Sequence, residues 1–160
     1  MAYDYNTGLP ISTTDANGQI TTMQYVDPLL RPTKVTAPNG HQTISEYGAG
    51  TSAETRFVKS RSQIDASTWN ESFSYFDGLG RPVRSQSVDD DGDVFVLSCY
   101  DNMGRVSKVT NPFRGYSNQT CATTTGLEWT TNTYDTAGRP FTVTTPDGAV
   151  VVAKLRMLAT

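Results

Sequence analysis

Polar and apolar residues along the chain form short runs separated by turn signals. Runs rich in Thr, Val, Ile or aromatic residues flank Asn17-Gly18, Asn39-Gly40, Asp91-Gly92 and Asp147-Gly148. Two such runs joined by Asn-Gly or Asp-Gly are typical of a β-hairpin with a type I′ turn, which requires positive φ at both central residues. The pattern therefore predicts four hairpins with type I′ turns.

A second pattern, aromatic-Asp-x-x-Gly-Arg, occurs in three places and is organised around the block from Tyr100 to Arg105. A degenerate copy has Leu30 at the glycine position, and the first copy, residues 3–10, lacks the Arg and carries one extra residue. A repeated block is first of all a structural unit. The motif residues are Tyr25, Asp27 and Arg31; Phe76, Asp77, Gly80 and Arg81; Tyr100, Asp101, Gly104 and Arg105; and Tyr134, Asp135, Gly138 and Arg139.

The two patterns share one register with a period of about 22 residues, as from Pro10 to Pro32. They predict one module over residues 1–160, with units near 3–25, 25–47, a degenerate 48–75, 75–100, 100–134 and 134–160. In the degenerate unit, Arg56 to Gln63 and Trp69 to Phe76 read as two strands joined by residues 65–68.

Each motif residue has an expected role. A short carboxylate such as Asp101 accepts hydrogen bonds from backbone N–H groups across a turn, and Gly104 is expected to have positive φ. Arg105 is expected either to bind a carboxylate of the adjacent unit or to lie over a Tyr ring. The alternative is that the aromatic, Asp and Arg side chains line a sugar-binding surface.

Composition favours an ordered all-β chain. Thr is abundant, and eight Tyr, six Phe and two Trp accompany a net charge of −3, whereas disorder goes with few aromatics and high net charge.

Thirteen dispersed basic residues indicate no nucleic-acid partner, since such partners need clustered Lys and Arg. No apolar run is long enough for a membrane span, and the start of the chain lacks the regions of a signal peptide. Repeats begin within a few residues of Met1, as in a segment of a longer protein.

Few residues suggest chemistry. His41 is the sole histidine and follows a predicted turn, no Cys and His cluster has zinc spacing, and Asp89 to Asp93 reads as a solvated hairpin tip rather than a calcium loop. We therefore expect no catalytic residue, no cofactor and no metal, and the chain is not expected to be an enzyme. Cys99 and Cys121 are interpreted as two unpaired thiols, with one disulfide as the alternative.

The stretch from Asn111 to Gly126 replaces a two-residue turn. Long loops in compact repeats are uncommon and often carry function. It is the candidate for a specialised surface, with a simple insertion as the alternative.

Units of Tyr-Asp-x-x-Gly-Arg, each followed by a strand, Pro and Asn-Gly, resemble the YD repeats of the RHS family, which also occur in teneurins and in shell proteins of bacterial toxin complexes. The resemblance covers nearly the whole chain. It implies an all-β fold in which an antiparallel meander of hairpin repeats forms part of a spiralling β shell. It also implies a secreted or cell-surface location.

Three functions follow as hypotheses. The first is a structural repeat module of an exported RHS protein, forming a wall or scaffold. The second is a carbohydrate-binding or adhesion module that uses the stretch from Asn111 to Gly126 and exposed aromatics. The third is a self-assembling subunit that joins copies through open strand edges. The expected partners are other repeats of a longer chain or other copies, and in the second case glycans.

Overall fold

The computed structural model describes residues 1–50, 56–115, 119–122 and 124–153. These residues form fourteen strands and no helix, which confirms the all-β fold class. None of them forms a helix long and apolar enough to cross a membrane. The chain divides into two compact units, Met1–Gly80 and Arg81–Thr160. The single module over residues 1–160 stays a prediction.

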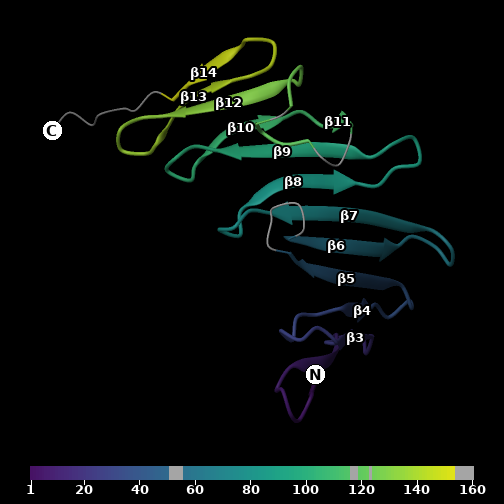
Figure 1. The fold of residues 1–160 in the computed structure, drawn as a ribbon. Helices are drawn as coiled ribbons and strands as arrows, with labels where there is room; N and C mark the ends of the chain where they lie inside the picture. The colour runs from purple at the N-terminus through teal and green to yellow at the C-terminus, as the bar shows by residue number, and fades with distance from the viewer. Residues whose placement is uncertain (51–55, 116–118, 123, 154–160) are drawn as a thin grey trace. The chain divides into compact units, whose positions relative to one another are not determined.

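The first unit is an antiparallel meander, in which each strand pairs with the next along the chain (Figure 1). The two strands expected in the degenerate repeat lie where the sequence predicts them. The strands are β1 (Ala2–Tyr3), β2 (Pro10–Thr14), β3 (Ile20–Gln24), β4 (Lys34–Thr36), β5 (Gln42–Ala49), β6 (Arg56–Gln63) and β7 (Trp69–Phe76).

The second unit continues the same pattern with one addition. Its strands are β8 (Pro82–Ser87), β9 (Val94–Tyr100), β10 (Val106–Thr110), β11 (Phe113–Arg114), β12 (Trp129–Tyr134), β13 (Pro140–Thr144) and β14 (Val150–Val152). Strands β8, β9, β10, β12, β13 and β14 pair in that order, all antiparallel, and the short β11 pairs with the start of β9. The predicted strand at Val150 is confirmed, and residues 154–158, expected as a strand or a frayed tail, lie outside the described residues.

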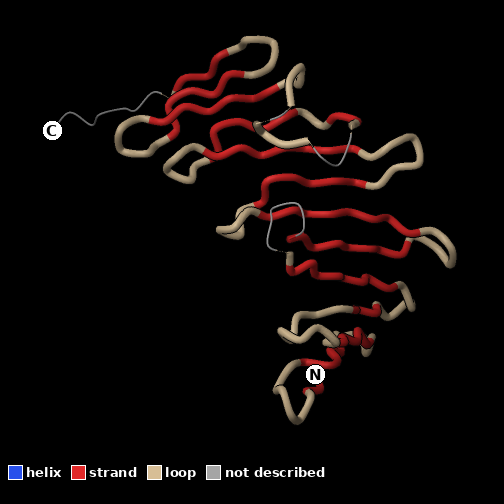
Figure 2. The backbone as a smooth tube through the Cα atoms, viewed as in Figure 1, coloured by secondary structure: helices blue, strands red, loops and turns tan. Residues whose placement is uncertain are grey.

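Two kinds of connection alternate in a meander, one at each end of the strands (Figure 2). We call the connections that begin at Asp4, Asp27, Asp77, Asp101 and Asp135 corners. The last three have the sequence Asp-x-x-Gly, whereas the first has one extra residue and the second has Leu30 in place of the glycine. The connections at the opposite ends are the hairpin turns, which include the predicted ones at residues 15–18, 37–40, 89–92 and 145–148.

The predicted type I′ geometry of the hairpin turns is wrong. Leu30 is the single described residue other than Gly with positive φ, so Asn17 keeps a negative φ while Gly18 has φ 78°. The Asp15 carboxylate accepts the N–H groups of Asn17 and Gln19 at 2.8 and 2.9 Å, which holds a turn closed by a left-handed glycine. This is the longer hairpin loop in which a type I turn precedes a glycine bulge.

The best-buried apolar side chains of the second unit lie along β9. Phe95 and Leu97 are each 1% exposed and Cys99 is 5% exposed, and these alternate residues share one face of the strand. Phe113 on β11 lies opposite Phe95, with ring centroids 6.1 Å apart. The stretch after β10 therefore contributes to the core of its own unit.

Candidate functional site

The corner beginning at Asp101 shows how the repeated motif folds. The Gly104 N–H donates to the Asp101 carbonyl at 2.9 Å, and Gly104 has φ 80°, as expected from the sequence. One carboxylate oxygen of Asp101 accepts the backbone N–H groups of Met103 and Arg105, each at 2.9 Å. The short carboxylate thus accepts hydrogen bonds from backbone N–H groups that the tight turn leaves without a backbone acceptor.

The arginine of a corner binds the aspartate of the same corner. Arg31 donates to both carboxylate oxygens of Asp27 at 2.6 and 2.8 Å, and Arg105 and Arg139 bind Asp101 and Asp135 through Nε and Nη2 at 2.7–2.8 Å. The Arg31 hydrogen bonds lower the pKa of Asp27 to about 2. The expected alternative, a carboxylate of the adjacent unit, is wrong for these arginines, because the turn brings residues four positions apart within reach.

Three corner arginines also lie over tyrosine rings of the next repeat, which confirms the other expectation for Arg105. The distance from the guanidinium carbon to the ring centroid is 3.9 Å for Arg31 over Tyr47, 4.3 Å for Arg81 over Tyr100 and 4.4 Å for Arg105 over Tyr134. A cation over an aromatic face is attracted by the ring quadrupole. Each of these arginines therefore joins two repeats.

The tyrosine hydroxyl completes the link. Tyr47, Tyr100 and Tyr134 donate to the carbonyl of the residue that follows the stacked arginine, namely Pro32, Pro82 and Val106, at 2.7–2.8 Å. Tyr25 makes the same bond to Pro10 at 3.0 Å although Leu9 stands where the arginine would be. We call this recurring arrangement the Arg–Tyr ladder.

The remaining motif residues belong to the corner after β7 and to the corner beginning at Asp135. Asp77 accepts the Leu79 N–H through its carboxylate at 2.9 Å, and Gly80 has φ 77°. Phe76 ends β7 and is half-buried. Gly138 repeats the geometry of Gly104 with φ 79°, and Arg139 has a 57% exposed side chain.

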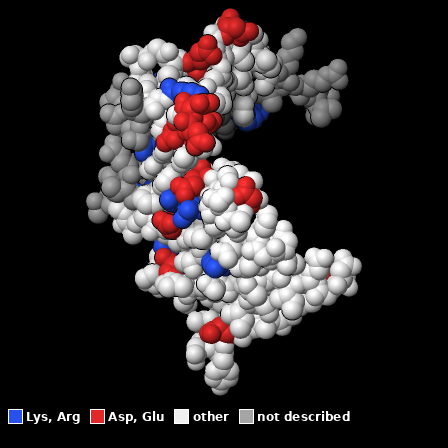
Figure 3. All heavy atoms as spheres, turned by 90° about the vertical axis from the view of Figure 1, so that its right-hand side faces the viewer, with Lys and Arg blue, Asp and Glu red and all other residues white. Residues whose placement is uncertain are grey.

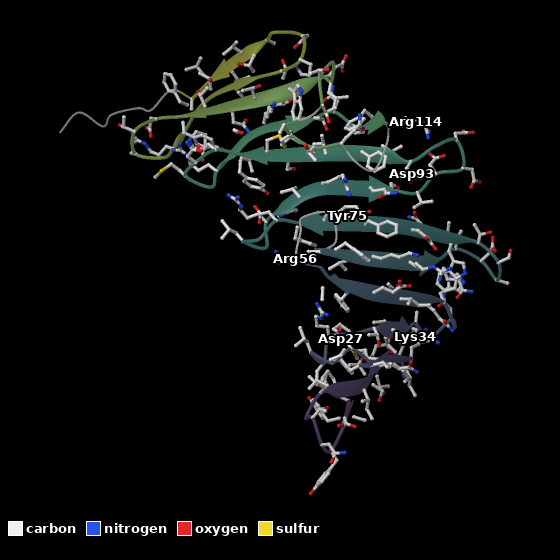
Figure 4. All side chains as sticks on the ribbon, viewed as in Figure 1. Asp27, Lys34, Arg56, Tyr75, Asp93 and Arg114 are labelled. Atoms are coloured by element: carbon white, nitrogen blue, oxygen red, sulfur yellow. A yellow bond between two sulfur atoms is a disulfide. The ribbon has the colours of Figure 1, made fainter. Side chains whose placement is uncertain are left out.

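Sequence reasoning missed Arg56, which donates to the Asp77 carbonyl at 2.6 Å and so supports the corner after β7 (Figure 4). It also missed an ion-pair cluster on β6 and β7, where Glu71 contacts Lys59 at 3.2 Å and Arg61 at 2.6 Å. Lys59 and Arg61 are two positions apart on β6, and residues two apart on a strand lie on the same face of the sheet. This spacing could have predicted that both share a face with Phe73, which pairs with Lys59.

The stretch from Asn111 to Gly126 is fastened to β9. Cys121 forms a disulfide with Cys99, with Cα atoms 5.8 Å apart, so the interpretation of two unpaired thiols is wrong. Their separation of 22 residues gave no sign that the stretch folds back onto β9. Residues 116–118 and 123, including the first of the three consecutive threonines, lie outside the described residues.

An ion pair fastens the same stretch at the other end of β9. Arg114 binds the Asp89 carboxylate at 3.1 Å and donates to the Gly92 carbonyl, so it holds the turn between β8 and β9 (Figure 4). The acidic tip is thus partly neutralised by this arginine. Among the described residues no three His, Cys, Asp or Glu side chains gather as metal ligands would, and His41 is exposed beside its turn.

Comparison with protein families identifies the repeats. Residues 49–148 match the model described as a domain of unknown function (DUF6443), and residues 3–49 match that of the RHS repeat. The chain belongs to the DUF6443 family and is an RHS/YD-repeat protein. No curated protein sequence matches this RHS-repeat chain significantly.

Solved structures resemble the fold of the RHS-repeat chain. The crystal structure of TcdB2-TccC3 is 16% identical in sequence to this chain, with a TM-score of 0.50. The alignment covers 94% of this chain and 12% of the chain in that structure. The crystal structure of TcdB2-TccC3-TEV is 13% identical in sequence, with a TM-score of 0.49. The alignment covers 94% of this chain and 14% of the chain in that structure. The RHS-repeat chain therefore spans about an eighth of the length of these structures.

Proposed function

We propose that this structural repeat module serves as a non-catalytic segment of a β-shell wall or scaffold in an exported protein. The main support is the Arg–Tyr ladder, in which the polar and aromatic side chains of the motif contact one another or the backbone. Arg105 binds Asp101 and covers Tyr134, and the Tyr134 hydroxyl binds the Val106 carbonyl. Groups engaged in this way stabilise a repeat junction, and few of them are left to bind a sugar.

The disulfide between Cys99 and Cys121 supports the exported location. Disulfides persist in oxidising environments and are rare in reducing ones. The expected partners are neighbouring repeats of a longer protein, because each repeat of such an array contacts its neighbours.

The experiment compares stability and glycan binding in matched variants. Asp101→Ala removes the acceptor of two backbone N–H groups and of Arg105 and is expected to lower the free energy of unfolding by about 2 kcal/mol. Asp91→Asn at an exposed hairpin tip is the control, with an expected change within about 0.5 kcal/mol. Urea denaturation and a glycan array are run on both. A corner variant of unchanged stability that loses a glycan bound by the parent chain would support carbohydrate binding instead.

A further inference from the structure

The hairpin turn between β4 and β5 carries the pair Asn39-Gly40 at its tip, and the proposed wall does not use this pair. Both residues are exposed, and a Cβ atom added at Gly40 would meet no described atom within 4 Å. The Asn39 side-chain carbonyl accepts the backbone N–H of His41 at 3.1 Å. An asparagine before an unhindered glycine is chemically reactive, because the glycine nitrogen can attack the side-chain amide carbon and close a succinimide ring.

The hairpin turn between β2 and β3 has the same Asn-Gly pair but begins with a different residue. Asp15 opens that turn, and its carboxylate accepts the N–H groups of Asn17 and Gln19 at 2.8 and 2.9 Å. Ala37 stands in the equivalent position of the second turn, which therefore lacks this carboxylate. In both turns the glycine N–H donates to the carbonyl of the opening residue, at 3.1 and 2.9 Å. That bond does not distinguish the two turns, whereas the Asp15 carboxylate does.

We propose that Asn39 is a self-modification site, at which the chain converts the asparagine to aspartate or isoaspartate without an enzyme. The Gly40 nitrogen bonds to the Asn39 side-chain carbon, the bond from that carbon to the side-chain nitrogen breaks, and ammonia leaves with the proton of the Gly40 amide. Water then opens the succinimide at either carbonyl. The reaction consumes only water, involves no oxidation or reduction, and adds one negative charge to the turn. It does not depend on the proposed wall.

Two electrostatic differences favour reaction at Asn39 over Asn17. Negative charge develops on the glycine nitrogen and then on the side-chain oxygen during the attack. The His41 N–H already binds this oxygen in Asn39 and stabilises the developing charge, whereas the described residues donate no hydrogen bond to the Asn17 side chain. The Asp15 carboxylate repels the developing charge in the first turn, and its two hydrogen bonds hold that turn away from the geometry of attack.

The aspartate product fits the turn, whereas isoaspartate does not. Asp147 has the equivalent position in the turn between β13 and β14, and its carboxylate accepts the Ala149 N–H at 3.3 Å, as Asn39 accepts that of His41. Exposed aspartates already occur at hairpin tips, and Figure 3, turned to the side of the hairpin turns, shows acidic groups at the surface. Isoaspartate routes the main chain through the former side-chain carbon and adds a methylene, so it is expected to disturb the pairing of β4 with β5.

The experiment ages the whole chain at neutral pH and physiological temperature and then digests it with trypsin. Cleavage after Lys34 separates the peptide that contains Asn17 from the one that contains Asn39. Mass spectrometry with fragmentation measures the conversion of each asparagine, and methylation by an isoaspartyl methyltransferase detects isoaspartate. Asn39 is expected to convert at least about fivefold faster than Asn17, which is the rate ratio that one typical hydrogen bond supports. Equal rates in the folded chain would overturn the proposal.

Exchanging the opening residues of the two turns tests the cause. Asp15→Ala is expected to accelerate conversion of Asn17 several-fold, and Ala37→Asp is expected to slow conversion of Asn39 by a similar factor. Asn39→Gln is the control, because it is expected to abolish the isoaspartate signal of this turn. Circular dichroism confirms that each variant is folded.

Unfolding the chain separates the effect of the turn from that of local sequence. In concentrated urea neither turn is formed, so the rates at Asn17 and Asn39 are expected to converge. A difference that persists undiminished in urea, or rates that both exchanges leave unchanged, would show that the folded turns do not select Asn39.

Discussion

The guanidinium carbon of Arg105 lies 4.4 Å from the centroid of the Tyr134 ring, although 29 positions separate the two residues in sequence. The same guanidinium binds Asp101 at 2.7 Å. One side chain thus closes its own corner and contacts the following repeat. Folding of a corner and docking of the next strand are coupled through this residue.

Replacing this arginine by lysine tests the coupling. Arg105→Lys keeps the charge but loses the planar fork and the stacked face, so the free energy of unfolding is expected to fall by about 1 kcal/mol. Urea denaturation provides the measurement. Arg139→Lys is the matched control, because Arg139 binds Asp135 in the same way but has no described ring over it; its loss is expected to be smaller. Equal losses would mean that the ring contributes nothing.

Leu30 occupies the left-handed conformation that glycine takes in the other corners, with φ 57°. For a residue with a Cβ atom this conformation costs about 1–2 kcal/mol, so Leu30→Gly is expected to raise the midpoint of thermal unfolding. Leu30→Ala is the control, since it removes the side chain and keeps the strain. A Leu30→Gly midpoint at or below that of Leu30→Ala would show that strain is unimportant here.

The corners were predictable because their determinants are local. Asp101, Gly104 and Arg105 lie within five residues, and hydrogen-bond geometry and positive φ follow from their types. The identity of the stacked ring was less accessible, since Tyr134 follows an inserted stretch of unpredictable path. The turn type was mistaken because Asn-Gly also suits a loop in which the glycine alone has positive φ, and the Asp15 carboxylate selects that loop.

The disulfide was missed for a related reason. Cys99 alternates with Leu97 and Phe95 on the buried face of β9, a pattern that also suits an unpaired buried thiol. Nothing in the residues from Asn111 to Gly126 specifies that Cys121 returns to that face. Long-range closure of this kind depends on tertiary packing.

Reduction of the disulfide tests its contribution. A bridge across 22 residues is expected to contribute about 3 kcal/mol, by limiting the unfolded chain. Urea denaturation with and without dithiothreitol measures the loss. Cys121→Ser, which leaves buried Cys99 in place, is expected to reproduce it and to be insensitive to the reductant. Alkylation of both cysteines in the native protein without reductant would contradict the bridge.

Acid is expected to destabilise the protein in part through Asp27. Hydrogen bonds from Arg31 lower the folded-state pKa of Asp27 from 3.8 to about 2. Because the folded-state pKa is depressed, the stabilisation is present above the unfolded pKa and is lost as the pH falls through the folded one. The melting temperature is therefore expected to fall between about pH 4 and about pH 2, and to fall less steeply in Asp27→Asn.

Asp65 provides the comparison for this effect, since its pKa is also lowered to about 2, chiefly by the backbone N–H of Ser67 and by Thr68. Salt screens the attraction between exposed charges such as Asp27 and Arg31. The melting temperature is therefore measured against pH in about 1 M NaCl, where the screening length is about 3 Å. Salt is expected to reduce the difference in acid sensitivity between the parent chain and Asp27→Asn. It is expected to reduce the difference between the parent chain and Asp65→Asn less. If salt leaves both differences unchanged, backbone N–H groups rather than the arginine hold the corner carboxylate ionised.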